Sequence, residues 1–272
     1  MKTRSVTVAD GVDLFCTDSG DSAGAGARPV VLVHGWLCDS DDWIHLIPLL
    51  TPHTRVITVD LRGHGRSTIA PSGYGPAVFA DDVATVMRAL GVSNAVVAGH
   101  SAGAEVGVLV GDRHPDLVAG LVAIDPVYAL PPERRAGFEA RAKKLSEPGA
   151  AALAAAHFAL IEGPHTPAYL REWHQRRPFA IAPHVMVETS RAFALGPDSI
   201  RLRPGADVVL LRRRVPVFAV YRDAAQAALD QALSPHPASE IHTWPDAGHW
   251  LHQEDPVRFH RELCRWLARL DR

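Results

Sequence analysis

The chain has 272 residues, of which 47% are hydrophobic and 21% charged, and its formal net charge is −2. This composition is typical of a globular protein and excludes a disordered or fibrous chain, while the length fits one large α/β domain with an insertion better than two independent domains. The small net charge excludes a broad electrostatic field for nucleic acid or an anionic membrane, and the basic run Arg212-Arg213-Arg214 is too short to provide one.

The start of the chain indicates neither a secretory signal nor a membrane anchor. Met1-Lys2-Thr3-Arg4 leads into alternating Val and polar residues and lacks the apolar stretch of about 7–15 residues that a signal requires. No apolar run reaches the roughly 18 residues of a membrane span.

The three cysteines of the chain do not form a recognisable motif. Cys16, Cys38 and Cys264 lie far apart outside any Cys-x-x-Cys pattern, which disfavours a disulfide framework and a zinc site. We expect a cytoplasmic protein that acts on a small molecule without a metal or organic cofactor, and not on nucleic acid or a membrane.

Short runs rich in Val and Ile alternate with longer helix-patterned segments along most of the chain. This alternation is typical of parallel strands joined by crossover helices, so we predict an α/β fold with a mostly parallel eight-stranded sheet flanked by helices. The first two strands are expected to form an antiparallel entry pair. Residues 19–26 are rich in glycine and poor in apolar side chains, which predicts a mobile surface turn. The predicted strands are residues 5–9, 12–17, 30–33, 56–59, 95–98, 121–124, 215–221 and 240–243.

From about residue 126 to residue 208 the alternation of strands and helices stops. Four helix-like stretches follow, separated by pairs such as Pro131-Pro132 and Pro148-Gly149. We interpret residues 126–208 as a helical cap inserted into a core formed by residues 1–125 and 209–272. The Ala, Leu and Phe content of the cap predicts a medium-sized, mostly apolar substrate. Five side chains of the cap fit substrate contact and helix packing equally well, and two of them, Tyr128 and Trp173, are kept as candidate substrate contacts. The five are Tyr128, Phe158, Trp173, His184 and Met186.

A Gly-x-Ser-x-Gly motif, Gly99-His100-Ser101-Ala102-Gly103, follows the predicted strand 95–98 and opens a helical run over residues 105–114. A nucleophile elbow places its serine on a strained strand-to-helix turn, where side chains in place of the glycines would collide with backbone. The start of the helix also points free N–H groups toward developing negative charge. This context favours Ser101 as a nucleophile over a structural glycine-rich turn. His100 is expected to pack beside the elbow at the substrate site.

His34-Gly35-Trp36 ends the predicted strand 30–33 and is the expected source of a second oxyanion donor. Around a nucleophile elbow, one backbone N–H comes from this loop and the other from the residue after the serine. The predicted donors are therefore the N–H groups of Trp36 and Ala102. The Trp36 side chain is also a candidate wall for the substrate, a role that competes with packing in the core.

Gly248-His249-Trp250 directly follows the last predicted strand and precedes an amphipathic terminal helix. A serine hydroxyl is a weak nucleophile near neutral pH and needs an imidazole to take its proton. The order serine then histidine is that of enzymes with this elbow, so His249 is the predicted general base. Trp250 is a candidate substrate contact. His64, which lies between two glycines, is interpreted as a turn residue.

Two aspartates compete for the role of the acid that orients His249. Asp125 ends the strand 121–124 and precedes the helix-breaking Pro126, whereas Asp223 follows the strand 215–221 and also fits the N-cap of a helix over residues 224–233. Both carboxylates are expected at the carboxyl edge of the sheet, where ligands bind in open α/β sheets. We favour Asp125 and keep Asp223 as the alternative, because geometry and not sequence position defines a triad.

The chain resembles the α/β-hydrolase superfamily over nearly its whole length. Epoxide hydrolases and dehalogenases of this superfamily carry an aspartate at the position of Ser101, so the resemblance disfavours those two activities. It implies an α/β-hydrolase fold but leaves the substrate open, because the superfamily hosts many reactions. The motifs that carry it are His34-Gly35-Trp36, Asp60-Leu61-Arg62-Gly63-His64-Gly65-Arg66-Ser67, the elbow at residues 99–103, and Gly248-His249.

An acid at the end of the sixth predicted strand is similar to the arrangement in zearalenone-type lactonases and some dehalogenases. It is also similar to cofactor-independent ring-cleaving dioxygenases, which carry a tryptophan at the position of Trp36 and use the histidine to deprotonate a hydroxylated heteroaromatic. The resemblance implies a hydrolase that cleaves an ester, lactone or similar activated carbonyl through Ser101, His249 and an aspartate, with an acyl-enzyme. The dioxygenase and a ligand receptor with slow or no turnover on the same fold are the alternatives.

Overall fold

The computed structural model describes residues 1–20 and 27–270, so most of the turn predicted over residues 19–26 lies outside the described residues. In this part of the chain eight strands form one sheet in the order β1-β2-β4-β3-β5-β6-β7-β8. The predicted sheet is confirmed, including its antiparallel entry pair: β1 pairs with β2 and β2 with β4 in antiparallel fashion, and the remaining pairs are parallel. The strands are β1 (Lys2–Ala9), β2 (Val12–Asp18), β3 (Val30–Val33), β4 (Val56–Val59), β5 (Ala95–His100), β6 (Val118–Ile124), β7 (Val217–Tyr221) and β8 (Glu240–Thr243).

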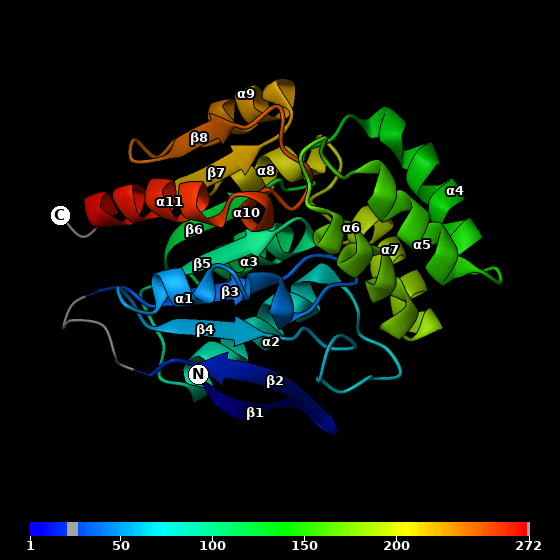
Figure 1. The fold of residues 1–272 in the computed structure, drawn as a ribbon, viewed down its shortest axis with the longest axis horizontal. Helices are drawn as coiled ribbons and strands as arrows, with labels where there is room; N and C mark the ends of the chain where they lie inside the picture. Colours follow the sequence, from blue (N-terminus) through cyan, green and yellow to red (C-terminus); the bar gives the residue numbers. More distant parts are fainter. Residues whose placement is uncertain (21–26, 271–272) are drawn as a thin grey trace.

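Helices cover both faces of the sheet, which explains the almost continuous Val and Ile runs of the central strands (Figure 1). Because successive side chains of a strand point to opposite faces, Val31 and Val33 enter one core cluster while Val30 and Leu32 enter another. The helices are α1 (Ile47–Leu50), α2 (Pro76–Ala89), α3 (Ala102–Arg113), α4 (Arg135–Leu145), α5 (Ala150–Leu160), α6 (Ala168–Arg176), α7 (Pro183–Leu195), α8 (Gly205–Leu211), α9 (Ala224–Ala232), α10 (Leu251–Glu254) and α11 (Pro256–Leu270), with short 3-10 helices at Ser40–Trp43, Pro132–Arg134 and Arg177–Ala180.

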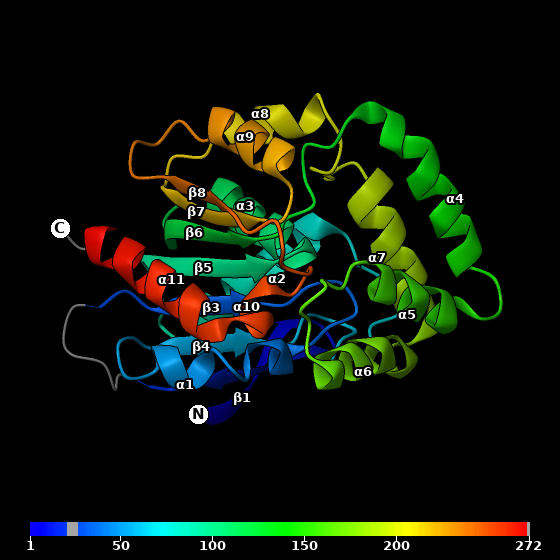
Figure 2. The same ribbon diagram turned by 45° about the horizontal axis from the view of Figure 1, so that its top comes forward.

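The helices α4 to α7 gather at one end of the molecule, beyond the ends of the strand arrows, in both views (Figures 1 and 2). They occupy the stretch in which the sequence predicts a cap. The predicted boundary at residue 208 falls inside α8, whose Ala206 and Leu210 are buried in the main core cluster. None of the helices described here is both long and apolar enough to cross a membrane.

The register of the parallel strands brings three loops to the same edge of the sheet. Val33 of β3 pairs with Gly99 of β5, and His100 of β5 pairs with Ile124 of β6. Residues that follow these pairs leave the sheet side by side at its carboxyl edge, which is where ligands bind in open α/β folds. This edge carries the loop at residues 34–36, the elbow at Ser101 and the turn at Asp125.

Candidate active site

Ser101 lies on a strained turn between β5 and α3. Its backbone φ of 52° and ψ of −118° fall in a region that L-residues rarely adopt, at a cost of about 1–3 kcal/mol. A Cβ atom on Gly99 would lie 2.2 Å from the backbone of Gly103, and one on Gly103 would lie 2.2 Å from the carbonyl oxygen of Val33. The two flanking glycines are therefore required by close backbone packing. The Ser101 N–H donates a hydrogen bond of 2.8 Å to the Ile124 carbonyl, which holds the turn to β6.

Asp125 is the carboxylate that contacts His249. The Nδ1–H group of His249 donates to Asp125 Oδ2 over 2.6 Å, and both residues are buried. Arg222 binds the same carboxylate through its backbone N–H, at 3.1 Å from Oδ1, and through Nε, at 2.7 Å from Oδ2. Burial alone would raise the pKa of Asp125, but the hydrogen bond and charge of His249 and the Arg222 guanidinium hold this pKa below its ordinary value. Asp125 is thus an ionised anchor for Nδ1 of the imidazole.

The competing acid, Asp223, faces the same cavity but forms a different set of contacts. Its Oδ1 accepts hydrogen bonds from the backbone N–H groups of Ala225, at 2.7 Å, and Gln226, at 3.1 Å. These are the contacts of an N-cap at the start of α9. Among the described residues it forms no hydrogen bond with His249, so the structure brings Asp125 and not Asp223 to the imidazole.

The backbone of the His249 loop is tied to the helical segment and to the elbow. The His249 N–H donates to the carbonyl of Ile161, at 2.9 Å, and that carbonyl also accepts from Arg222 Nη1, at 3.3 Å. The His249 carbonyl in turn accepts a hydrogen bond of 2.9 Å from His100 Nε2. His100 therefore packs beside the elbow, where it supports the histidine loop.

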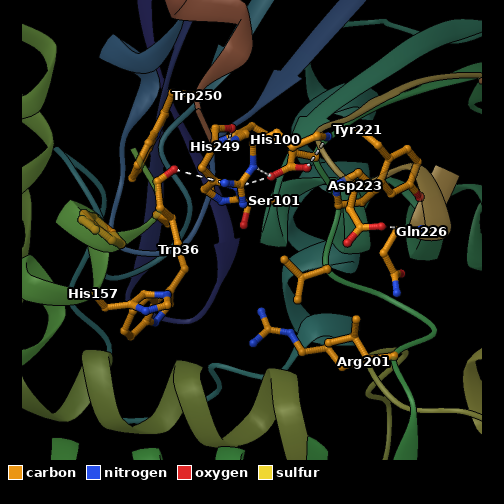
Figure 3. A pocket seen from close by; sticks show the side chains of 18 of the residues that line it. Trp36, His100, Ser101, His157, Arg201, Tyr221, Asp223, Gln226, His249 and Trp250 are labelled. Atoms are coloured by element: carbon orange, nitrogen blue, oxygen red, sulfur yellow. Dashed lines mark hydrogen bonds and ion pairs between the residues drawn. The ribbon is translucent and has the colours of Figure 1, made fainter. Parts of the chain in front are cut away.

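Ser101 and His249 line the same cavity and lie next to one another in the close view (Figure 3). Within the described residues the Ser101 hydroxyl forms no hydrogen bond, so its oxygen is free to approach a substrate or the imidazole. Proton transfer requires the hydroxyl and the imidazole to come within hydrogen-bond distance, and hydrogen bonds of catalytic pairs often tighten only when the substrate binds.

Two backbone N–H groups beside Ser101 are available as hydrogen-bond donors. Ala102 is the first residue of α3, so its N–H has no acceptor within the helix. Neither this group nor the N–H of Trp36 donates to any residue that the structure describes. The Trp36 loop packs closely on the elbow, because a Cβ on Gly35 would lie 2.9 Å from His100 Nδ1 and 3.4 Å from Ser101 Cβ. Both N–H groups are therefore unpaired donors among the described residues, on two segments that pack against each other at the elbow.

The cavity in front of Ser101 has a volume of about 460 Å³ and lies between the sheet edge and the helices α4, α5 and α7. Of the predicted substrate contacts, Trp36, His100 and Trp250 line it, and so does Phe158, which fits contact and packing equally well from the sequence. The Trp36 ring is fixed there by a 2.8 Å hydrogen bond from Nε1 to Thr189 Oγ1. The ring thus packs against its neighbours and also forms part of the cavity wall.

Tyr128 and Trp173, both predicted substrate contacts, do not line this cavity, and the prediction is corrected for each. Tyr128 is buried, and its hydroxyl donates to Asp230 Oδ2 over 2.8 Å. Trp173 is 42% exposed, and its ring lies under the guanidinium of Arg177 at 5.3 Å. The remaining side chains weighed from the sequence that also lie outside the cavity are His184 and Met186.

The cavity wall is more basic than the composition of residues 126–208 predicts. Four arginines line it, where the sequence favours a mostly apolar lining. The sequence pattern gives little warning, because the charged residues of α4 and its flanks are spaced like those of a solvated helix face. The lining arginines are Arg134, Arg141, Arg201 and Arg222.

Three histidines near the site have lowered pKa values and are neutral at neutral pH. Burial lowers the pKa of His252 to about 3 and that of His100 well below its ordinary value. Burial and the nearby Arg141 lower the pKa of His157, on the cavity wall, to about 4. Over residues 1–20 and 27–270, no group of three His, Cys, Asp or Glu side chains could hold a metal ion. A serine hydroxyl without a hydrogen bond in the described part of the chain, in one cavity with an imidazole whose Nδ1 is held by a carboxylate, is an arrangement that can support acyl transfer.

Comparison with known proteins gives consistent results. The sequence profile of the alpha/beta hydrolase fold family matches residues 28–185. A bifunctional esterase/perhydrolase from Acinetobacter calcoaceticus is 43% identical over 127 residues, which are 46% of this chain and 45% of that protein, so the match spans less than half of its length. The esterase RhEst1 from Rhodococcus sp. ECU1013 has a TM-score of 0.80 at 25% identity, over 99% of this chain and 100% of that one. A thermophilic esterase from Thermogutta terrifontis has a TM-score of 0.83 at 23% identity over the full length of both chains, which shows a shared fold.

Proposed function

The chain belongs to the alpha/beta hydrolase fold family, and we propose that it is a serine hydrolase that cleaves an ester, lactone or similarly activated carbonyl through an acyl-enzyme. The observation that carries the proposal is one cavity that combines three features. They are Ser101 on a strained elbow, His249 anchored by a buried carboxylate, and two unpaired backbone N–H groups. The similarity to an esterase/perhydrolase supports the same reaction class.

In the proposed mechanism, Ser101 Oγ attacks the carbonyl carbon while His249 Nε2 accepts the hydroxyl proton. The N–H groups of Trp36 and Ala102 hold the oxyanion, and Asp125 keeps Nδ1 of the imidazole protonated and stabilises the imidazolium. The imidazolium then donates its proton to the leaving alcohol, and the acyl group remains on Ser101. A water molecule, deprotonated by His249, attacks the acyl carbon and restores the serine.

We further propose that the helices α4 to α7 act as a cap that determines selectivity. A cavity of about 460 Å³ lies in the range of sites for small and medium-sized ligands. Cap residues contribute to its wall, including Phe158 of α5 and Ser190 of α7. Substitutions at these positions are expected to alter KM between substrates more than they alter kcat.

Perhydrolysis is a second candidate activity, favoured by the matched esterase/perhydrolase. The acyl-enzyme would be the same, and hydrogen peroxide in place of water would attack the acyl carbon. This step releases a peracid and returns the proton to Ser101 through His249. Measuring peracid against free acid at increasing peroxide concentration tests it, and acid as the sole product at all concentrations would refute it.

The test of the proposed hydrolase combines turnover and labelling. The protein is incubated with short-chain p-nitrophenyl esters and, separately, with a fluorophosphonate probe followed by mass spectrometry. We expect ester turnover and one label on Ser101, both abolished in Ser101→Ala. Absence of both in the unaltered protein would refute the hydrolase and favour a ligand receptor. Oxygen uptake with hydroxyquinolones, without ester turnover, would favour the ring-cleaving dioxygenase.

A further inference from the structure

Two of the guanidinium groups that line the cavity containing Ser101, those of Arg141 and Arg201, are partly or largely buried. Arg141 lies on α4, and Arg201 lies on the segment between α7 and α8. In the close view the Arg201 side chain extends into the pocket from the side opposite Ser101 and His249 (Figure 3). Arg201 therefore faces the reacting groups across the space that a substrate would fill, and Arg141 lines the same cavity beside Trp36.

Arg141 is partly buried and has no carboxylate partner among the described residues. Its Cζ lies 4.4 Å from the centroid of the Trp36 ring, and its Nη1 donates to His157 Nε2 over 3.2 Å. Burial and the charge of Arg201 lower the pKa of Arg141 to about 10. A partly buried cation without a counter-ion is unfavourable, and the neighbouring arginine adds repulsion. Stacking on Trp36 orients the guanidinium but leaves its charge unneutralised.

Arg201 is 9% exposed and has one partial counter-ion. Its Nε donates to Glu105 Oε1 over 2.8 Å, while its two terminal amino groups form no hydrogen bond to a described residue. Burial outweighs the attraction of Arg201 and raises the pKa of Glu105 to about 7, so this carboxyl is protonated in a substantial share of molecules at neutral pH. The second oxygen, Oε2, has no hydrogen-bond partner. The pair of arginines thus carries an excess of positive charge toward the cavity.

We propose that Arg141 and Arg201 form a carboxylate-binding subsite, and that the substrate is an ester that carries a carboxylate away from its scissile carbonyl. This inference rests on the proposed hydrolase function and adds the substrate class. Unpaired guanidinium N–H groups match the oxygens of a carboxylate in geometry and charge. A bound carboxylate would supply the missing counter-ion, and it would place the substrate with one end on the arginines and the other at Ser101.

The test uses two matched pairs of esters. Mono-4-nitrophenyl glutarate is compared with 4-nitrophenyl pentanoate, and 4-carboxyphenyl butyrate with phenyl butyrate, so that the carboxylate lies in the acyl group or in the leaving group. In at least one pair we expect a higher kcat/KM for the charged ester. Arg141→Met should lower the charged-to-neutral ratio of that pair by about 10-fold to 100-fold, the value of a lost hydrogen bond to a charged group. Arg135→Met, on the same helix but paired with Glu139 and outside this cavity, is the matched control.

Binding of glutarate itself separates this inference from the proposed function, because glutarate has no ester bond. Calorimetric titration should detect glutarate binding to the unaltered protein and to Arg135→Met. Arg141→Met should weaken it about 10-fold or more. Glutarate binding without turnover of any ester would refute the hydrolase and keep the subsite. Turnover of neutral esters, without preference for either charged ester and without glutarate binding, would overturn the subsite and keep the hydrolase.

Discussion

Replacement of Asp125 by asparagine tests the geometry of the candidate triad most directly. The carboxylate accepts a 2.6 Å hydrogen bond from His249 Nδ1, and Arg222 holds its orientation from the other side. An asparagine of nearly the same shape can present its amide N–H₂ to the ring, which favours the tautomer with the proton on Nε2. That tautomer cannot accept the proton of Ser101, and the cost in the best-studied triad is about 10⁴ in kcat, or roughly 5 kcal/mol of transition-state stabilisation.

The matched control is Asp223→Asn, because Asp223 lines the same cavity and carries the same charge. Asparagine caps helices about as well as aspartate does, so this variant should keep the start of α9, the stability and kcat close to those of the unaltered protein. Both variants are assayed for kcat with p-nitrophenyl butyrate, with thermal unfolding followed by circular dichroism. A larger loss of kcat in Asp223→Asn than in Asp125→Asn, at equal stability, would refute the assignment of the acid.

Three further predictions concern the elbow, the buried acid and the oxyanion loop. Gly103→Ala places a Cβ 2.2 Å from the backbone and should lower the free energy of unfolding, measured by urea titration, by several kcal/mol. The control is Gly111→Ala, whose Cβ would lie 3.8 Å from its nearest neighbour and which should be neutral or stabilising in the same titration. Since burial raises the pKa of Glu105 from 4.5 to about 7, its contribution to stability is complete below pH 4.5 and is lost as the pH rises to about 7, by about 3 kcal/mol. Melting temperatures of Glu105→Gln should lack this decline, and equal pH profiles for the two proteins would contradict it. Insertion of one glycine after Trp36 should displace one oxyanion donor and lower kcat by about 10²–10³ without unfolding the protein; an unchanged kcat would exclude this donor.

The sequence predicts the sheet well because its physical signal is local. Runs such as 30–33 and 56–59 are apolar at every position, and only strands covered on both faces by helices satisfy that pattern. The elbow is equally predictable, because the positions of Gly99 and Gly103 leave no space for any larger residue. The expected placement of Ser101, His249 and Asp125 at one edge follows from the parallel order of the strands, which requires only the ends of each run.

Residues outside the sheet are harder to place, because their partners are remote in sequence. Tyr128 follows Asp125 by three positions and was expected in the cavity. Positive φ values at Asp125 and Ala129 turn the chain, and the hydroxyl of Tyr128 instead joins a buried cluster with Asp230 and Arg213. No pattern in residues 126–130 predicts a hydrogen bond to Asp230, about a hundred positions away.

Arg141 is a cavity residue that the sequence pattern does not identify. On a helix with charges at many positions, its spacing does not separate it from solvated neighbours. The side chain faces the cavity because α4 packs close to Trp36. The charge of the cavity wall therefore depends on tertiary packing, and composition does not predict it.

The carbonyl of Ile161 supports two members of the candidate site at once. It lies at the end of α5 and accepts from both the His249 N–H and Arg222, which are the supports of the imidazole and of its carboxylate. Because one backbone oxygen holds both groups, a displacement of this end of α5 would loosen the imidazole and the guanidinium together, so the order of the catalytic histidine depends on a residue of the helical segment.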